Sequence, residues 1–387
     1  MITTQAPLRE KMTLFWHDHF ASSQQKVREP YFMHLQNELF RNHALGSFHT
    51  LTREIVTDPA MMIFLDAQNS RRERPNENFA RELFELFTLG EGNYTEEDIR
   101  EAARAFTGYR LNRITANVTH LPRQWDGGRK NVLAKSGRFT GTDVVDVIFE
   151  RPGPSRFIAR KLWEYFAYEN PPEPAVDAMA KTLQAHDHHI APLLREIFLS
   201  REFYKPEIIG NQIKSPVQFL VQLFHELEIS EPPQGFLLTA QQQLGQVLFA
   251  PPNVSGWDHG KAWINTNTLL ARYNLAGFIT TGSETSAQSL AAPGMRGGGG
   301  GMAAIARRSA RNWNGPDYDA VMPRDLRDDP AAIVDHLMRR FGLEHSPERA
   351  RDAFVEFANA KHGVIFTNTE VGELCHLMLS TPYYQLC

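Results

Sequence analysis

Cysteine is almost absent from this chain. Only two of the 387 residues are cysteines, Cys375 and Cys387, and both stand near the C-terminal end. Two thiols in this position supply neither a disulfide framework nor a zinc site built from thiolates. The two cysteines therefore do not show whether the protein works in an oxidising or a reducing compartment.

Long apolar runs are missing as well. No stretch reaches the roughly 18 consecutive apolar residues that a membrane-spanning helix needs. The first residues, MITTQAPLREK, lack the apolar core of a signal peptide. The sequence thus predicts no membrane span, and it leaves the compartment unknown.

The chain also lacks an excess of basic residues. The chain has 41 lysines and arginines against 45 aspartates and glutamates, a formal net charge of −4. A protein that binds nucleic acid or an anionic membrane usually carries a strongly basic surface. The charge balance therefore argues against either as the main partner. The common catalytic signatures Gly-x-Ser-x-Gly, His-Glu-x-x-His and the P-loop are also absent.

Helical periodicity dominates what is present. The composition, 42% hydrophobic and 22% charged, is that of a globular protein. Apolar residues recur at helical spacing, and caps and prolines separate the segments. We predict an all-α fold, an array of antiparallel helical hairpins in one compact body, with a minor β hairpin near 111–140. We expect residues 1–280 to form the main domain, 281–316 a flexible Gly-rich insertion, and 317–387 helices that dock on the main domain.

Two helices with clear signals meet in residues 75–109. Asn76 is the predicted cap of the first, and Thr95 with Asp98 predicts a capping box at the start of the second. The apolar stripe of the first helix consists of Phe79, Leu83, Leu86 and Phe87.

The other side of that first helix carries more ionisable groups than a solvent face needs. Arg81 can pair with Glu77 or Glu85 at helical spacing. Such an exposed pair stabilises a helix by only about 0.2–0.5 kcal/mol, which is too little to explain the arrangement. We therefore interpret Glu82 and Glu85 as catalytic candidates, and Asn78 and Arg81 as ligand-binding candidates.

The same stretch, NENFARELFELFTLGEGNYTEEDIREAARAFTGY, resembles the signature of the bacterial family named domain of unknown function 1800, or DUF1800. Three further stretches resemble that family: LFWHDHF at 14–20, SRFIARKLWEYF at 155–166 and PPNVSGWDHGKAWINT at 251–266. Together they extend the resemblance over most of the chain. The resemblance implies a family without implying a reaction.

The resemblance carries further expectations. Proteins of this family usually begin with additional helices before the WHDHF segment and often carry an export signal to the periplasm or cell envelope, so this chain looks short at its start. Their genes commonly neighbour genes for exported sulfatase- or phosphatase-like proteins, which implies such a protein partner. The family usually has a His-Asp pair and a Gly-Lys-Thr run where this chain has Trp125-Asp126-Gly127-Gly128 and Lys130-Asn131. A function that depends on that histidine is therefore in doubt here.

The first predicted helix, residues 8–23, brings His19 to its apolar face, together with Met12, Phe15, Trp16 and Phe20. His17 lies about 200° away around the helix, so the two histidines cannot bind one metal. A buried His19 needs a polar partner, for which we expect a carboxylate. The alternative is that His19, with Asp18 beside it, is a metal ligand or a general base.

Residues 251–263 form an irregular, Pro- and Gly-rich loop that carries Trp257, Asp258, His259 and Trp263. The loop must bury its two tryptophans against something. One interpretation is a structural plug, and the other is the wall of a ligand site that suits a sugar or another polar ring. We expect this loop, the His19 face and the polar side of the 76–89 helix to converge on one pocket.

A run of histidines, His186-Asp187-His188-His189, looks like a metal-binding tract. It stands where a cap is needed before a helix predicted at 190–200, and we interpret it as that cap.

Two functions from different classes follow from these patterns. In the first, the protein is a metal- or acid/base-assisted hydrolase with Asp18, His19, Glu82 and Glu85 around a polar pocket. A divalent metal is the cofactor that such a site would use, and the sequence does not identify its ligands. In the second, the protein is a non-catalytic binding or assembly protein that works with an exported sulfatase- or phosphatase-like partner.

Overall fold

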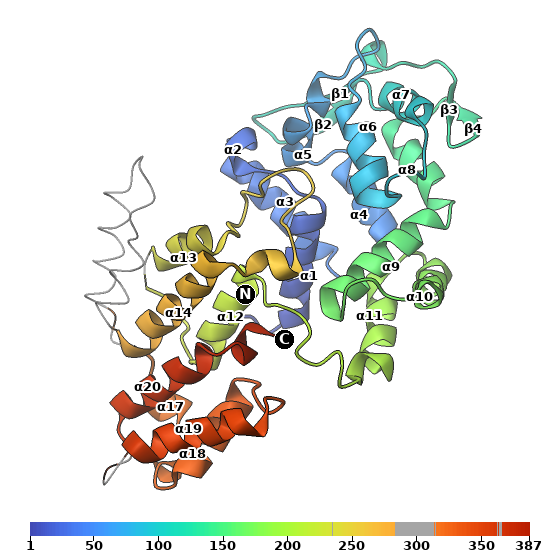
Figure 1. Cartoon of the computed structure of the whole chain (residues 1–387). Helices are drawn as coiled ribbons and strands as arrows, with labels where there is room; N and C mark the ends of the chain where they lie inside the picture. The colour runs from blue at the N-terminus through green and yellow to red at the C-terminus, as the bar shows by residue number, and fades with distance from the viewer. Residues whose placement is uncertain (234, 283–312, 314, 362, 364–365) are drawn as a thin grey trace. The chain divides into compact units, whose positions relative to one another are not determined.

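Helices dominate the computed structural model, which describes residues 1–233, 235–282, 313, 315–361, 363 and 366–387. These residues form 18 α-helices and two small two-stranded sheets (Figure 1). The all-α prediction is therefore confirmed. Most of the predicted Gly-rich insertion, residues 283–312, lies outside the described residues.

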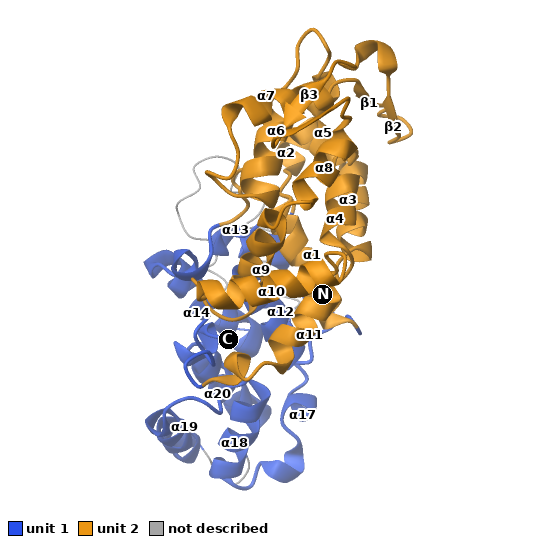
Figure 2. Ribbon diagram, turned by 90° about the vertical axis from the view of Figure 1, so that its right-hand side faces the viewer, with its two compact units in different colours: residues 1–5, 206–248, 258–387 blue, residues 6–205, 249–257 orange. Residues whose placement is uncertain are grey.

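The described chain divides into two compact units (Figure 2). Unit 1 contains residues 1–5, 206–248 and 258–387, and unit 2 contains residues 6–205 and 249–257. Unit 2 thus includes one short segment from much later in the sequence, 249–257. The domain boundaries expected near residues 280 and 317 stay a prediction.

Unit 2 holds the stretches that the sequence analysis singled out first. Its α-helices are α1 (Pro7–His19), α2 (Gln24–Val27), α3 (Pro30–Asn42), α4 (Phe48–Ile55), α5 (Pro59–Phe64), α6 (Asn78–Glu82), α7 (Glu96–Ala105), α8 (Gly141–Phe149), α9 (Gly153–Phe166), α10 (Glu173–Ala185) and α11 (Ile190–Leu199). Its strands are β1 (Tyr109–Leu111), β2 (Val118–His120), β3 (Lys130–Val132) and β4 (Lys135–Gly137).

Local chemistry sets the starts of several of these helices. The Asp58 carboxylate accepts a hydrogen bond from the Met61 N–H, and Pro59 opens α5. Thr95 and Asp98 form the predicted capping box at the start of α7. Thr95 and Asp98 lie within four residues of the helix end that they fix, which is why the sequence revealed this capping box.

The β structure differs from the single predicted hairpin, because two antiparallel pairs form, β1 with β2 and β3 with β4. The second pair turns through Leu133 and Ala134, whose φ angles are 50° and 63°. Such left-handed angles are uncommon for residues other than glycine. The turn therefore has no signal in the sequence.

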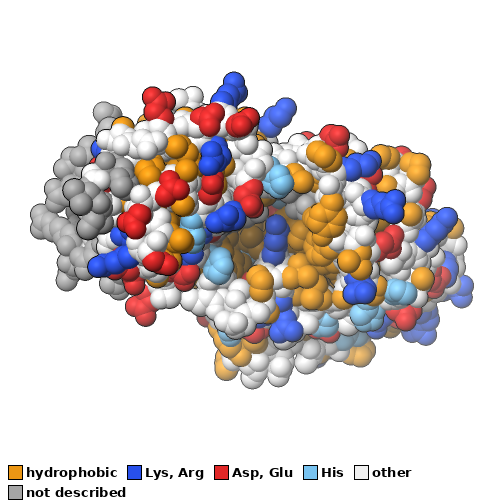
Figure 3. All heavy atoms as spheres, turned by 90° about the horizontal axis from the view of Figure 1, so that it is seen from below, with side chains coloured by type: hydrophobic (Ala, Val, Ile, Leu, Met, Phe, Trp, Pro, Cys, Tyr) orange, Lys and Arg blue, Asp and Glu red, His pale blue; other side chains and the backbone are white. Residues whose placement is uncertain are grey.

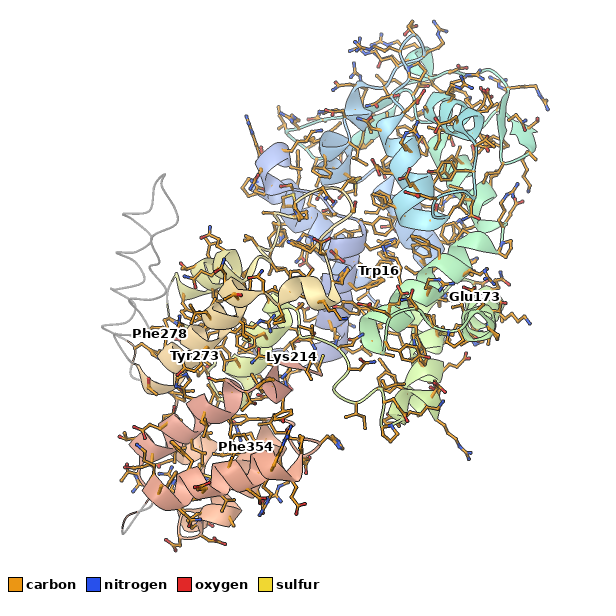
Figure 4. The ribbon with its side chains drawn as sticks, in the orientation of Figure 1. Trp16, Glu173, Lys214, Tyr273, Phe278 and Phe354 are labelled. Carbon is orange, nitrogen blue, oxygen red and sulfur yellow. The ribbon has the colours of Figure 1, made fainter. Side chains whose placement is uncertain are left out.

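Aromatic rings fill the core of unit 2 beside α1. Trp16, which Figure 4 labels, is fully buried. It stacks on Phe48, with ring centres 5.6 Å apart. The Trp16 indole N–H donates to the Ala44 carbonyl at 3.1 Å. Burying a large aromatic side chain and satisfying its N–H fixes the orientation of α1 within the unit.

Unit 1 is built from α12 (Pro216–Glu226), α13 (Phe236–Leu244), α14 (Thr266–Thr281), α17 (Tyr318–Val321), α18 (Pro330–Arg340), α19 (Glu348–Lys361) and α20 (Asn368–Leu379). A continuous hydrophobic core joins these helices. No helix within the described ranges is long and apolar enough to cross a membrane. On the face drawn in Figure 3, acidic and basic side chains are interspersed.

Ionisable groups lie inside unit 1. The Lys214 ammonium lies 3.7 Å from the ring centre of Tyr384, and the Tyr384 hydroxyl donates to the Glu226 carboxylate at 2.7 Å. Arg272 is 1% exposed and donates to the Lys214 carbonyl at 2.7 Å. Burial lowers the pKa of Lys214 to about 8 and that of Arg272 to about 10. Figure 4 labels Lys214 within this unit.

Candidate functional site

Helix α1 ends earlier than predicted, at His19 rather than at residue 23. Its last turn is almost completely buried, with His17 and His19 each 3% exposed. Both histidines therefore face the interior, although the helical periodicity placed only His19 there. The segment 249–257 buries the His17 side of α1, because it packs on His17 through Phe249 and Trp257.

His17 and Asp18 hold that segment through its backbone. The Phe249 N–H donates to His17 Nε2 at 2.9 Å, and the Trp257 N–H donates to Asp18 Oδ1 at 2.8 Å. Gly256 lies so close that a Cβ added there would be 2.3 Å from Asp18 Oδ1. Trp257 itself is 4% exposed. Within unit 2 this arrangement fits the interpretation of the loop as a structural plug.

His19 makes a different contact from the expected one. Its Nε2 lies 3.0 Å from the Phe87 carbonyl oxygen, which can only accept a hydrogen bond. His19 must therefore carry its hydrogen on Nε2 and a lone pair on Nδ1. Burial and the nearby Lys161 charge hold the pKa of His19 well below its usual range. The expectation of a carboxylate partner is thus wrong, because a carbonyl at a helix end also needs a donor.

The Nδ1 atom of His19 faces Lys161 of α9, whose Nζ lies 3.3 Å away. Lys161 is half-buried, with its ammonium 5.3 Å from the ring centre of Phe157. Burial lowers the pKa of Lys161, while the charges of Asp18 and Glu164 act in the opposite direction. The sequence analysis missed Lys161, because helical periodicity groups it with the exposed side of α9.

The first helix of the central stretch is not a regular α-helix throughout. Helix α6 gives way at Leu83 to a π-helical turn, Leu83–Thr88, labelled η2 in the structure. The Leu89 N–H and the Gly90 N–H both bond to the Phe84 carbonyl, and Thr88 Oγ1 bonds to the Leu83 carbonyl. Single π turns of this kind occur frequently at functional sites.

The polar side of this helix is partly neutralised. Arg81 pairs with Glu96 through two nitrogens at 2.8 Å and with Glu77 at 3.4 Å. The predicted pairing with Glu77 is therefore confirmed, whereas Glu85 instead accepts a hydrogen bond from the Tyr94 hydroxyl at 2.7 Å. Tyr94 is positioned by its ring, which stacks on Phe84. Arg81 is thus occupied by carboxylates of the protein itself.

Glu82 stands apart from these pairs. Its side chain is half-buried, and among the described residues its carboxylate has no hydrogen-bond or ion-pair partner. Burial, and next the charge of Glu85, raise the pKa of Glu82, while Arg81 acts weakly in the opposite direction. Glu82 ends α6 and Glu85 stands three residues further on in the π-helical turn, and the charge of Glu85 acts on Glu82. The pair thus combines a carboxyl group whose pKa is raised with a carboxyl group that accepts a hydrogen bond from Tyr94.

The family model described as "Protein of unknown function (DUF1800)" matches residues 1–386. The chain belongs to the DUF1800 family. No curated protein and no solved structure matches it. The resemblance is therefore confirmed, and the family description assigns no activity.

The remaining candidates in this DUF1800 protein are divided between the two units. Asn78 is exposed at the start of α6. Asp258, His259 and Trp263 belong to unit 1, whereas Trp257 belongs to unit 2. Trp263 is 5% exposed, and the His259 ring meets it edge-on at 6.4 Å. The roles of these residues as ligand contacts stay a prediction.

The histidine tract 186–189 precedes the helix as expected, but no side chain of the tract caps it by a hydrogen bond. His189 occupies the cap position of α11 without a side-chain hydrogen bond to the helix. Asp187 and His188 have positive φ angles, 49° and 59°, so the tract is a tight turn after α10. The His188 carbonyl accepts the Phe48 N–H, and its Nδ1 lies 3.1 Å from Ser155 Oγ. The turn ties α4, α9 and α11 together.

Metal ligands are not gathered in the described part of this DUF1800 chain. No group of three or more His, Cys, Asp or Glu side chains there could hold a metal ion. The loop residue Asp126 pairs with Arg104 at 2.7 Å. That pair connects the loop to α7.

Proposed function

We propose that this protein is a hydrolase in which Glu82 is the general acid and Glu85 the general base. The observation that carries the proposal is the half-buried Glu82 carboxyl, which has no partner among the described residues and a raised pKa. A carboxyl without a donor or a cation beside it costs free energy when it ionises, so it keeps its proton to higher pH. Such perturbed groups occur preferentially at functional sites.

The chemistry follows from the difference between the two carboxyl groups. A protonated Glu82 can donate its proton to the leaving oxygen of an ester or glycoside, while Glu85 takes a proton from the attacking water. Two carboxyls whose environments differ are the usual acid and base of hydrolases. The Tyr94 hydroxyl orients Glu85 through its 2.7 Å hydrogen bond.

A divalent cation is the cofactor that the same pair would take. Magnesium is commonly held by one or two carboxylates together with several waters. With a cation bound, Glu82 would be ionised and would hold the ion instead of a proton. The two versions of the proposal therefore make opposite predictions for the effect of a chelator.

The experiment is a hydrolysis assay with chromogenic carboxylic, phosphate and sulfate esters and glycosides. We expect the wild-type protein to turn over at least one class, and Glu82→Gln to lower that rate by about 10²-fold or more, as for loss of a general acid. Glu97→Gln, at an exposed ion pair on α7, is the matched control and should leave the rate unchanged. EDTA abolishes the rate in the metal version and leaves it unchanged in the acid/base version.

Two results would contradict the hydrolase proposal. One is a folded wild-type protein that turns over none of these substrates with or without added Mg²⁺ or Mn²⁺. The other is a Glu82→Gln variant as active as the wild type. Melting temperatures of all variants, expected within a few degrees of each other, separate lost chemistry from lost folding.

The second candidate function is that of a non-catalytic assembly protein with a sulfatase- or phosphatase-like protein partner. It is favoured by the internal use of His17, Asp18 and His19, whose hydrogen bonds go to Phe249, Trp257 and Phe87. Those side chains would then serve to build a rigid scaffold. Co-expression with a sulfatase- or phosphatase-like protein, followed by light scattering, tests it. A stoichiometric complex whose activity resides in the partner supports it, and two separate monomers contradict it.

A further inference from the structure

Two segments of unit 2, residues 67–74 and 108–124, contain many arginines and almost no acidic residues. The arginines are Arg71, Arg72, Arg74, Arg110, Arg113 and Arg123, and the only acidic residue in the two segments is Glu73. Six positive charges against one negative charge give these segments a net charge of +5, whereas the whole chain has −4. The charge balance of the chain therefore conceals a local excess of basic residues.

Backbone hydrogen bonds bring the two segments together. The Gly108 N–H donates to the Ser70 carbonyl at 3.1 Å, and the Arg72 N–H donates to the Gln124 carbonyl at 2.8 Å. Within the second segment, β1 and β2 form an antiparallel hairpin, which Figure 2 draws at the edge of unit 2. The six arginines thus belong to adjoining parts of one surface, which we call the arginine edge.

Most of the charge of the arginine edge is not neutralised by the protein. Arg72 forms an ion pair with Glu73 at 3.2 Å. Arg74, Arg113 and Arg123 are exposed and have no ion-pair partner among the described residues. Guanidinium groups bind phosphate oxygens through two parallel hydrogen bonds. The arginine edge therefore fits a partner that presents several phosphate groups.

An apolar side chain projects from the same hairpin. Ile114 stands in the turn between β1 and β2 and is 94% exposed. The Asn112 side chain accepts the N–H groups of Ile114 and Thr115, at 2.9 and 3.3 Å, and thereby holds the turn. A polyanion dissolved in water would leave this side chain exposed. A bilayer, in contrast, offers phosphate groups at its surface and acyl chains directly below them.

We propose that the arginine edge and Ile114 form a binding surface for an anionic phospholipid bilayer. The guanidinium groups bind lipid phosphates, and Ile114 inserts at the boundary between the headgroups and the acyl chains. The attachment is peripheral and reversible, because it uses surface charge and one apolar side chain rather than a membrane-spanning helix. It does not depend on the Glu82 and Glu85 pair.

Co-sedimentation of the full-length protein with vesicles tests the proposal. One set of vesicles contains phosphatidylcholine alone, and the other contains equal parts of phosphatidylcholine and phosphatidylglycerol. We expect the partition coefficient to be about tenfold higher or more for the anionic set, and to fall at high salt, which screens the attraction. Equal or undetectable binding to the two sets would overturn the proposal. Binding to heparin or to single-stranded DNA without binding to vesicles would also overturn it, because the partner would then be a dissolved polyanion.

A matched pair of double variants tests the arginines. Arg113→Gln combined with Arg123→Gln should lower the partition coefficient for anionic vesicles by about tenfold or more. Arg195→Gln combined with Arg201→Gln removes two exposed charges elsewhere in unit 2, next in sequence to Glu196 and Glu202, and should change it less than twofold. Equal losses in both double variants would show attraction by net charge alone and contradict the assignment.

A second pair tests the apolar tip. Ile114→Ser should lower the partition coefficient by about fivefold or more, because the inserted side chain no longer leaves water. Leu199→Ser changes another exposed apolar residue of unit 2, 68% exposed, and should have no effect. An Ile114→Ser variant that binds as well as the wild type contradicts insertion. All substituted side chains are exposed, so melting temperatures should stay within a few degrees of the wild type.

Discussion

The His19 imidazole donates a hydrogen bond to the carbonyl of Phe87 at 3.0 Å. The last residue of α1 thus supplies the donor for a carbonyl near the end of the π-helical turn. The bond joins two segments that the sequence analysis had already linked to function. It also fixes the tautomer of His19 and leaves it no free N–H for proton transfer. In the proposed hydrolase the chemistry therefore belongs to the polar side of the 78–88 helix.

His19→Asn is expected to destabilise the protein strongly. The change removes a ring packed among aromatic side chains and disturbs two hydrogen bonds, which costs about 2–4 kcal/mol in the free energy of unfolding. Urea denaturation measures this cost. Glu82→Gln, which breaks no contact among the described residues, is the comparison and should stay within about 0.5 kcal/mol of the wild type. Similar stabilities for both variants would contradict the structural role of His19.

Gly256→Ala should loosen the segment 249–257. The new Cβ would lie 2.3 Å from Asp18 Oδ1 and 2.7 Å from the Asp18 carbonyl oxygen, at a φ of +87°. Gly92→Ala is the matched control, because Gly92 has a φ of +79° but nothing within 4 Å of its added Cβ. We expect Gly256→Ala to lower the free energy of unfolding by about 2 kcal/mol more than the control, since backbone strain is common to both. Equal losses would show that the contact with Asp18 is unimportant.

His17 should make stability fall in mild acid. Burial lowers its pKa from 6.5 to about 4, so between these values the unfolded chain binds a proton that the folded chain does not. This contribution is fully present above pH 6.5 and is lost as the pH falls towards 4. Between pH 7 and pH 5 the wild type should lose ~2 kcal/mol more than His17→Gln, measured by urea denaturation. Parallel pH profiles would contradict the assignment of a neutral, buried His17.

Lys214 predicts a slope of the same sign in mild alkali, because its pKa is also lower in the folded protein. Its pKa is about 8 when folded against 10.5 ordinarily, so the unfolded chain binds the extra proton between these values and stability rises with pH. From pH 8 to pH 10 the wild type should gain ~2 kcal/mol relative to Lys214→Met. Guanidinium denaturation of both proteins at each pH measures the difference. A constant difference would mean that Lys214 stays charged in the folded protein.

Local signals explain what could be predicted from the sequence. Thr95 and Asp98 act on the helix end beside them, so their residue types were sufficient to predict it. The contact of Asp18 with Trp257 joins residues far apart in the chain, and neither residue type specifies the other. The π-helical turn and the β3–β4 turn lack a local signal for the same reason. The polar side of the helix was predictable, whereas the isolation of Glu82 depends on where Arg81 and Tyr94 point.

The most direct test of the central claim is an NMR titration of the Glu82 side-chain carboxyl, which requires no substrate. With ¹³C-labelled glutamate and Glu82→Gln for assignment, we expect the Glu82 resonance to titrate with a pKa above the ordinary 4.5, because burial and the Glu85 charge raise it. In Glu85→Gln the pKa should shift down, since the neighbouring charge is gone. A pKa at or below 4.5 that does not respond to Glu85→Gln would contradict the role of Glu82 as the proton-holding acid.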